Sequence, residues 1–385
     1  MVESAATTGS RVAAIDASRG AAMLFVCLSH FAEAYLRRNA MPADWAIGLS
    51  MVASPTFMLV SGCLLGFFSV TRRERFAATV LSYAGRGLFL LTVGRLIILV
   101  AHVALAGGVW RALHWAFITD AIGVCLLVGP AIVARASAGA RAVAAAVLFG
   151  LSWFFVLVWR PTSPLGRVIE ETLYGPYGPY GTHWYADVFP LVPWVAIFLL
   201  GTCFGDRLAR LPAGDRPART ALAARWSGAF LLCGAATWLA GRGLAQAGVA
   251  RVALGHGFFS PFRKLPPSPV YVAVYGGIGL AILAFLLWSE PWAVLPRLRS
   301  ALEVLGRNSL VAFMTGYFVY FTALVVADVG YTPLWPALFV LTVAIVFLVA
   351  LAWDRTGWNR HLTLKVPLAM RHALARVSGL RPAGR

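Results

Sequence analysis

Long apolar stretches, separated by short polar connections, repeat along nearly the whole chain. A helix of about 20 mostly apolar residues is needed to cross about 30 Å of hydrocarbon. Ten stretches meet this length and are predicted transmembrane helices: residues 13–34, 46–69, 77–106, 115–134, 141–159, 187–204, 222–247, 269–288, 307–327 and 333–353. The third is long enough to be tilted or broken. The pattern predicts an all-α, polytopic membrane protein of about ten transmembrane helices.

Composition supports this fold class. Of the 385 residues, 60% are hydrophobic and 12% are charged, and the mean hydropathy is +0.76, which is far from the averages of soluble domains. The net charge is +18, but the basic residues lie in short segments between apolar stretches, so we predict a lipid bilayer and no nucleic acid as partner. Arginine outnumbers lysine by 31 to 2, which we attribute to the composition of a bacterial genome.

The distribution of basic residues predicts the topology. Ten spans place both termini on one side of the membrane, and cytoplasmic segments hold the excess of lysine and arginine. With both termini inside, 21 basic residues lie in cytoplasmic segments, 8 in the opposite segments and four within spans. We therefore expect an N-in, C-in protein of the bacterial cytoplasmic (inner) membrane. A cleaved signal peptide is the alternative for the first stretch, but no convincing small-x-small cleavage site follows it.

The chain is predicted to hold one membrane domain, residues 13–354. A disordered cytoplasmic N-terminus, residues 1–12, precedes it, and a basic, amphipathic cytoplasmic tail, residues 355–385, follows it. Two long exterior segments, residues 160–187 and 250–269, are rich in aromatic residues, which either stack on a sugar or lie at the membrane interface. All five cysteines lie in apolar stretches without a CxxC pattern, and we interpret them as small core residues.

The first apolar stretch carries four ionisable side chains. Arg19 and His30 are eleven residues apart, about three helical turns, so they share one face about 16 Å apart along the axis. Asp16 precedes Arg19 by three residues and Glu33 follows His30 by three, a spacing at which side chains meet on a helix. Charges within a membrane are costly and mark a wet cavity or protein interior. Polar contacts that hold helices together are the alternative.

These residue types suit acyl transfer across a membrane. An imidazole can take a proton from a hydroxyl or amine as it attacks a carbonyl, and a carboxylate on its other nitrogen fixes the tautomer. His30 and Glu33 fit these roles. Arg19 lies nearer the cytoplasm and suits an anionic partner or a structural pair with Asp16. A cytosolic thioester would then extend its acyl arm outward to an acceptor that approaches from the far side.

Several stretches resemble the membrane acyltransferase-3 superfamily. IDASRGAAMLFVCLSHF is similar to its opening signature, in which an arginine within a D-x-x-R-G context is followed by a histidine. SPTFMLVSGCLLGFF resembles the second helix with its Ser-Gly pair, Ser61 and Gly62, and LSYAGRGLFLL resembles the third helix with its embedded arginine, Arg86. LGRNSLVAFMTGYF is similar to the start of a late helix in several branches.

One branch of this superfamily resembles the chain more closely than the others do. DVFPLVPWVAIFLLGTCFGD and FRKLPPSPVYV resemble the catalytic domains similar to heparan-α-glucosaminide N-acetyltransferase. The chain departs from many superfamily members in its late helix, where it has FMTGYF and they carry a histidine after the Ser-Leu segment. No second intramembrane histidine is therefore expected in that helix.

The resemblance implies transfer of an acyl group, commonly acetyl from acetyl-CoA, to a hydroxyl or amino group of a carbohydrate-type acceptor outside the cytoplasm. It implies His30 as the catalytic histidine, Arg19 as its partner, and Arg86 as an arginine that meets the phosphates or acyl carbonyl of an acyl-CoA donor. No metal is expected, because His102, His114 and His256 lack the spacing of a metal site.

The candidate site residues fall into three groups. The predicted catalytic group is His30, Glu33, Arg19 and Asp16; the donor-binding group is Arg86, Arg95, Ser61, Arg307 and Asn308; the acceptor-binding group is Asp187, His183, Trp184 and Lys264. Alternatives stay open for several. Arg95 snorkels if it does not line the donor path, and Arg307 with Asn308 either binds phosphate at a helix start or only marks topology. Asp187 could instead cap a helix, and Asp120 either lines the site or pairs at a helix interface.

A transporter is the alternative from another functional class, since paired charges within helices and aromatic loops also describe a substrate pathway. The absence of an internal repeat and of matched broken helices in the sequence counts against it. A noncatalytic membrane scaffold is a third hypothesis. It predicts that the protein tolerates the loss of both Arg19 and His30.

Overall fold

A computed structural model describes residues 12–175, 189–249, 251–290 and 296–378. Within these ranges the regular secondary structure is helical and no β-strand is present. Nine described helical segments are long and apolar enough to cross a membrane. The protein is therefore an all-α, polytopic membrane protein, which confirms the predicted fold class.

The helices follow one another with short connections. The first half of the chain contains α1 (Ala13–Phe31), η1 (Ala32–Arg37), α2 (Asp44–Ser50), α3 (Ala53–Thr71), η2 (Arg73–Arg75), α4 (Phe76–Phe89), η3 (Leu90–Gly94), α5 (Arg95–Ala106), α6 (Val109–Leu113), α7 (Ile118–Arg135), α8 (Ala138–Val158) and α9 (Pro164–Leu173). The second half contains α10 (Leu191–Arg210), α11 (Arg216–Gln246), α12 (Arg251–Gly255), α13 (Pro269–Trp288), α14 (Pro296–Arg307), α15 (Ser309–Tyr317), η4 (Phe318–Ala323), α16 (Leu324–Val326), α17 (Trp335–Thr356), η5 (Trp358–His361) and α18 (Leu368–Ser378).

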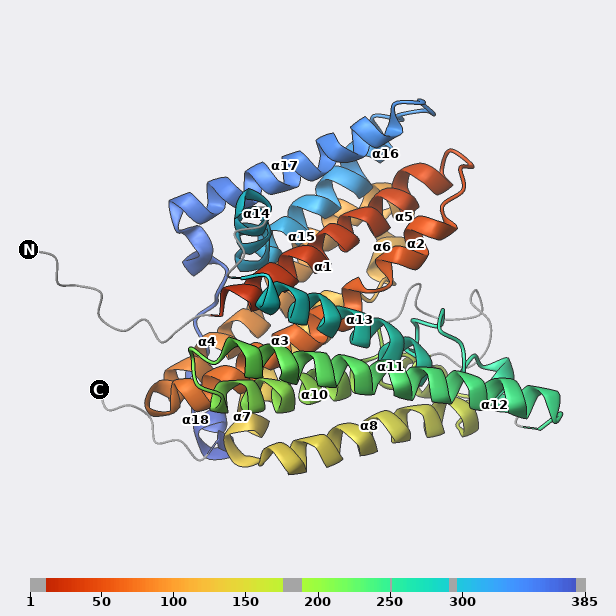
Figure 1. The fold of residues 1–385 in the computed structure, drawn as a ribbon. Coiled ribbons are helices and arrows are strands. Elements are labelled where there is room, and N and C mark those ends of the chain that lie inside the picture. The colour runs from red at the N-terminus through yellow and green to blue at the C-terminus, as the bar shows by residue number, and fades with distance from the viewer. Residues whose placement is uncertain (1–11, 176–188, 250, 291–295, 379–385) are drawn as a thin grey trace, which may run out of the picture.

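The first predicted span, α1, is not among the nine apolar segments. Its ionisable side chains lower its hydropathy, so length and composition do not mark it as a membrane helix. It nevertheless lies within the bundle, where it packs against α3, α13, α14 and α15 (Figure 1). With α1 included, the arrangement agrees with about ten spans, and α1 is surrounded by other helices.

Two glycines let α1 and α14 cross at very short range. A Cβ added to Gly20 would lie 1.9 Å from the carbonyl oxygen of Leu302, and one added to Gly306 would lie 1.7 Å from that of Asp16. Only a residue without a Cβ fits at such a crossing. The glycine that follows Arg19 in the D-x-x-R-G motif therefore serves helix packing, and it brings the start of α15 beside Arg19.

The long predicted third span is one helical run from η2 to α5 with a π-helical segment, η3, in its middle. Two further π-helical segments, η1 and η4, follow α1 and α15. Such segments insert extra residues into a helical turn and re-aim the side chains that follow. All three adjoin helices that form the candidate site described below.

The helices α8, α11 and α17 lie at the periphery and expose many valine and leucine side chains, as expected for surfaces in lipid. In Figure 1, α17 forms the upper edge of the bundle and α8 the lower edge. Four cysteines are buried, but Cys233 is exposed on α11. Its interpretation as a core residue was wrong, because hydropathy does not distinguish a core-facing position from a lipid-facing one.

The basic tail folds back onto the bundle. The backbone N–H of Leu364 donates to the carbonyl oxygen of Gly85 over 3.1 Å, and Arg135 at the end of α7 donates to the carbonyl oxygen of Arg376 in α18. The predicted disordered segment, residues 1–12, lies outside the described residues apart from Val12. The described part of the tail, residues 355–378, is thus packed against the membrane domain.

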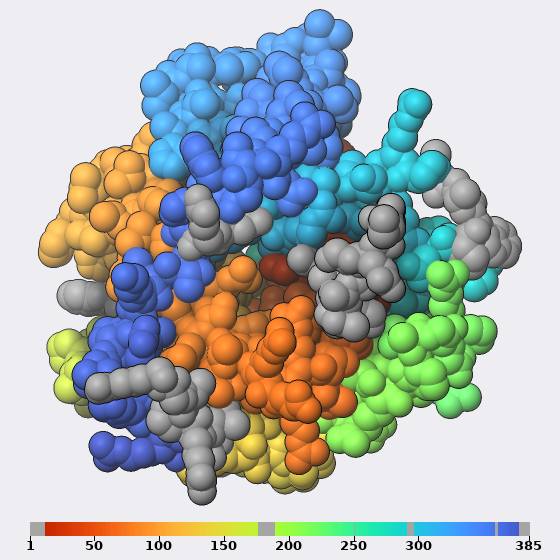
Figure 2. Space-filling model, turned by 90° about the vertical axis from the view of Figure 1, so that its left-hand side faces the viewer, coloured from red at the N-terminus to blue at the C-terminus, as the bar shows by residue number. Residues whose placement is uncertain are grey.

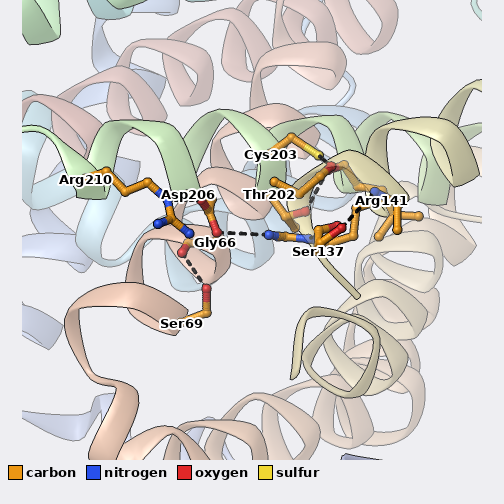
Figure 3. Close-up of polar contacts among 11 residues, drawn as sticks. Gly66, Ser69, Ser137, Arg141, Thr202, Cys203, Asp206 and Arg210 are labelled. Carbon is orange, nitrogen blue, oxygen red and sulfur yellow. Dashed lines mark hydrogen bonds and ion pairs between the residues drawn. The ribbon is translucent and has the colours of Figure 1, made fainter. Parts of the chain in front are cut away.

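A buried ion pair joins α8 to α10 (Figure 3). Nη2 of Arg141 lies 3.1 Å from Oδ2 of Asp206, and Nε of Arg210 lies 2.7 Å from Oδ1 of the same carboxylate. Arg141 also donates through Nε to the carbonyl oxygen of Ser137, just before α8. One carboxylate therefore binds two guanidinium groups, one inside the protein and one on its surface.

Candidate functional site

A cavity of about 1820 Å³ runs beside α1. Figure 2 shows a hollow on the face where α1 begins, with dark red atoms of α1 deep inside it and orange atoms of the first hundred residues at its rim. Three exposed arginines that follow α3, Arg72, Arg73 and Arg75, line one end, and the exposed Glu33 after α1 lines the other. Because α1 and α3 run antiparallel (Figure 1), these residues lie at opposite ends of the bundle.

This cavity collects most of the predicted site residues. Eight of the ten candidates that the structure describes line it: Arg19, His30, Glu33, Ser61, Arg86, Lys264, Arg307 and Asn308. Asp16 and Arg95 are not part of the lining. Asp187, His183 and Trp184 lie outside the described residues.

His30 lies on the cavity wall within a group of aromatic rings from α15 and η4. Its ring centroid is 4.9 Å from that of Tyr317, 4.7 Å from that of Phe321 and 5.8 Å from that of Phe313. Nδ1 of His30 is buried and has no hydrogen-bond partner among the described residues, whereas Nε2 is not enclosed in this way. The ring thus presents one nitrogen to the cavity and is held in place by packing.

The expected pairing of His30 with Glu33 is not formed in the structure. The carboxylate of Glu33 instead lies 2.8 Å from Nη1 of Arg37 in an exposed ion pair. The physical reason is the π-helical segment η1, which begins at Ala32, directly before Glu33. The wider turn removes the ordinary α-helical relation between residues three apart, so Glu33 does not orient the imidazole here.

Arg19 is positioned by a contact across the α1–α14 crossing. Its Nη2 donates a hydrogen bond of 2.6 Å to Oγ of Ser309 at the start of α15. Asp16 lies one turn earlier and is buried, with 2% of its surface exposed. Arg19 therefore faces the cavity, while Asp16 belongs to the packed crossing behind it.

Positive charge gathers at the end of the cavity where α1 begins. Six arginines line this part, which we call the arginine end: Arg19, Arg72, Arg73, Arg75, Arg86 and Arg307. Among the described residues, two carboxylates, Glu74 and Asp354, accompany them in the lining there. Such a cluster forms an attractive potential for a polyanion.

The arginines differ in how far protein carboxylates already neutralise them. Arg307 binds Asp354 through Nη2 at 2.8 Å, and Asn308 donates to the same carboxylate over 2.8 Å. Arg73, Arg75 and Arg86 are exposed and make no ion pair within the described part of the chain. These three arginines are the ones most available to a ligand.

Arg95 lies outside the cavity in a helix-to-helix pair. It binds the carboxylate of Asp120 at the start of α7 and donates to the carbonyl oxygen of Trp115 over 3.2 Å. Asp120 also accepts the backbone N–H of Phe117 over 3.0 Å and so caps α7. Of the two roles weighed for Asp120, the structure shows the interface pair.

Comparison with protein families bears on the activity of this site. The catalytic family of heparan-alpha-glucosaminide N-acetyltransferase matches residues 11–239, which is more than half of the chain. The chain belongs to this family. A search of curated proteins found no match.

Membership of the heparan-alpha-glucosaminide N-acetyltransferase catalytic family supports a membrane acetyltransferase that acts on a glucosamine-type acceptor. The matched region includes Arg19, His30 and Arg86. The aromatic rings around His30 belong to α15 and η4, which lie beyond residue 239. The cavity is therefore lined partly by residues within the matched region and partly by helices that follow this region in the chain.

His102 is a cavity residue that the sequence did not single out. It lies on α5, it is 2% exposed, and it lines the same cavity as His30. In the sequence it was considered only as a metal ligand, and no group of three or more metal-ligating side chains occurs among the described residues. No local signal marks it, because its neighbours in the sequence are apolar and its partners lie on other helices.

Proposed function

We propose that this protein is an integral-membrane acetyltransferase. It moves an acetyl group from acetyl-CoA to an amino or hydroxyl group of a glucosamine-type acceptor on the other side of the membrane. The observation that carries this proposal is a single cavity that holds His30 and reaches exposed residues at both ends of the bundle. A donor and an acceptor could thus meet at one imidazole from opposite sides.

The arginine end suits the nucleotide part of the donor. Coenzyme A carries a diphosphate and a ribose 3′-phosphate at the end of the molecule farthest from its thioester. Guanidinium groups bind phosphate oxygens through charge-assisted, often bidentate hydrogen bonds. With the nucleotide at Arg73, Arg75 and Arg86, the pantetheine arm extends along α1 and places the thioester near His30. The excess of basic residues on this side supports its assignment to the cytoplasm of a bacterial cell.

The chemistry at His30 follows from its neutral, aromatic surroundings. Its Nε2 takes a proton from the acceptor as the acceptor nitrogen or oxygen forms a bond to the thioester carbonyl carbon. The carbon–sulfur bond then breaks, and the same proton passes from the imidazolium to the departing thiolate. Atoms and charge balance over the cycle, and His30 returns to its starting state without a metal.

The proposal is tested by a transfer assay. Purified protein in lipid nanodiscs is incubated with acetyl-CoA labelled in its acetyl group and with a glucosamine-terminated oligosaccharide. We expect labelled, acetylated acceptor and an equal amount of free coenzyme A thiol. A protein that neither binds acetyl-CoA nor releases the thiol would contradict the proposal. Movement of the unmodified oligosaccharide across the membrane of proteoliposomes would instead favour the transporter.

A variant of the arginine end tests the donor's position. Replacing both Arg73 and Arg75 with alanine is expected to weaken coenzyme A binding at least tenfold, because hydrogen bonds to charged groups are each worth about 1.5–3 kcal/mol. The affinity for 3′-dephospho-coenzyme A should change much less. Titration calorimetry with both ligands measures the difference.

The matched control is Arg111→Ala, which removes an exposed arginine from α6, outside the cavity. Its affinity for both ligands should equal that of the wild type. Equal losses for coenzyme A and its dephospho form in the double variant would show that these arginines do not read the 3′-phosphate.

A further inference from the structure

The tail that follows α17 borders the arginine end of the cavity. Leu362 lines the cavity, and the side chains of Leu362 and Leu364 pack against a buried apolar cluster of the bundle. Val366 is also buried. In Figure 2, dark blue atoms of the tail lie beside the orange atoms at the rim of the hollow. The tail is therefore anchored by apolar contacts at the place where the proposed donor would enter.

The tail makes a backbone contact with α4 directly beside Arg86. The N–H of Leu364 donates to the carbonyl oxygen of Gly85 over 3.1 Å. A Cβ added to Gly85 would lie 2.5 Å from the carbonyl oxygen of Leu364 and 2.7 Å from Cγ2 of Thr363. A residue with a Cβ does not fit against another backbone at such a distance, so this contact requires glycine. The next residue is Arg86, whose exposed side chain lines the cavity.

A second glycine allows a close contact on the other side of Arg86. A Cβ added to Gly87 would lie 2.6 Å from the carbonyl oxygen of Gly123 on α7. Successive residues of a helix are rotated by about 100° around its axis, so the tail and α7 approach α4 on either side of the Arg86 side chain. The tail also reaches α7 itself, where Arg135 donates to the carbonyl oxygen of Arg376 in α18. The helix α4 is thus held between α7 and the tail, and Arg86 leaves it between these two contacts.

We propose that Gly85 and the tail position Arg86 for the phosphates of acyl-CoA, so that their contact raises the affinity for the donor. This inference rests on the proposed donor binding at the arginine end. An arginine side chain loses rotamer freedom when it binds a ligand, and a backbone that is already fixed avoids the further cost of ordering the helix. When the tail is displaced, the backbone beside Arg86 loses one of the two contacts that hold it. Gly85 is therefore a positioning residue, whereas Arg86 touches the donor.

The first test is Gly85→Ala, which places a methyl group against the backbone of the tail. We expect the affinity for coenzyme A to fall at least about fivefold, the lower end of the usual coupling between two sites. The value of kcat at saturating acetyl-CoA should not change, because His30 lies away from this contact. Alanine favours a helix more than glycine does, so a lower affinity would not come from a weaker α4. Gly150→Ala on α8 is the matched control, because no described atom lies within 4 Å of its added Cβ, and it should bind coenzyme A as the wild type does.

A double-mutant cycle shows whether the contact acts through Arg86. Two residues that act as a unit give losses that do not add, whereas independent residues give losses that do. Arg86→Ala alone should weaken coenzyme A binding, and Gly85→Ala in the same chain should cause no further loss. Losses that multiply would show that the tail does not position Arg86, and they would overturn the inference.

Hydrogen exchange on the wild-type protein provides a test that needs no variant. If the tail contact raises the affinity for coenzyme A, then coenzyme A must stabilise the tail contact by the same factor, because binding free energies are reciprocal. Saturating coenzyme A should therefore slow deuterium uptake at the N–H of Leu364, measured by mass spectrometry of a peptide from the tail. Unchanged uptake there would overturn the inference even if Gly85→Ala failed to fold.

The outcomes distinguish this inference from the proposed function. Wild-type protein that binds no coenzyme A would remove the proposed function, and the role of the tail with it. Wild-type protein that binds coenzyme A and transfers acetyl groups, together with wild-type affinity in a folded Gly85→Ala variant, would overturn the role of the tail alone. The tail would then serve to cover the apolar cluster of the bundle.

Discussion

Replacing His30 with glutamine is expected to lower kcat for acetyl transfer by about 10²–10⁴-fold, the usual contribution of a general base. Glutamine fills much of the same space between Tyr317 and Phe321 but cannot accept and return a proton. The affinity for coenzyme A should not change, because the arginine end binds the nucleotide at a distance from the imidazole. Steady-state kinetics and ligand titration on the same preparation measure the two effects separately.

A second variant shows whether the lost group is a base. His30→Ala leaves a space on the cavity wall, and added imidazole should raise its transfer rate, whereas imidazole should not affect the wild type. His114→Gln, on a histidine whose Nδ1 lies 2.8 Å from the carbonyl oxygen of Trp110, is the control for a general effect of losing a histidine. A wild-type rate in His30→Gln would exclude His30 as the base.

Replacing Asp206 with alanine is expected to lower the free energy of unfolding by about 3–5 kcal/mol, the typical cost of breaking a buried ion pair by removing one partner. The variant leaves the guanidinium group of Arg141, which is 2% exposed, without its carboxylate inside the α8–α10 contact. Arg141 cannot lose its charge by releasing a proton. The change is measured by unfolding the protein with increasing concentrations of a denaturing detergent and following its tryptophan fluorescence.

The same carboxylate provides its own control. Arg210 binds Asp206 from the surface and is 67% exposed, and ion pairs between exposed groups contribute little to stability. Arg210→Ala should therefore unfold at the wild-type denaturant concentration. If Asp206→Ala also unfolds at that concentration, the ion pair inside the protein adds nothing measurable to the stability of this fold.

Most helix positions could be predicted because hydropathy is a local property. The span predicted at 269–288 coincides with α13, and the one predicted at 141–159 differs from α8 by three residues at its start. The π-helical segments η1 and η4 were not expected, because they depend on how side chains of neighbouring helices pack. The position of Cys233 on a lipid-facing surface was missed for the same reason.

The candidate site was predictable only in part. The spacing of Arg19 and His30 placed both on one face of a helix, and the structure places both in one cavity wall. The pairing of His30 with Glu33 was wrong, because η1 interrupts the α-helical spacing on which that prediction depended. Arg95 forms an ion pair with Asp120, a residue 25 positions away, and therefore does not line the cavity.

Local sequence patterns were sufficient to predict the all-α membrane fold, the approximate spans, the family resemblance and the polar face of α1. These features depend on residues close together in the chain, whose relative positions a helix sets with its own hydrogen bonds. Which arginines of the cavity make no ion pair, and that His102 lies beside the rings that contact His30, became visible once the helices were packed together. Such contacts join helices up to hundreds of residues apart, so they depend on packing, glycine crossings and π-helical turns that no local pattern specifies.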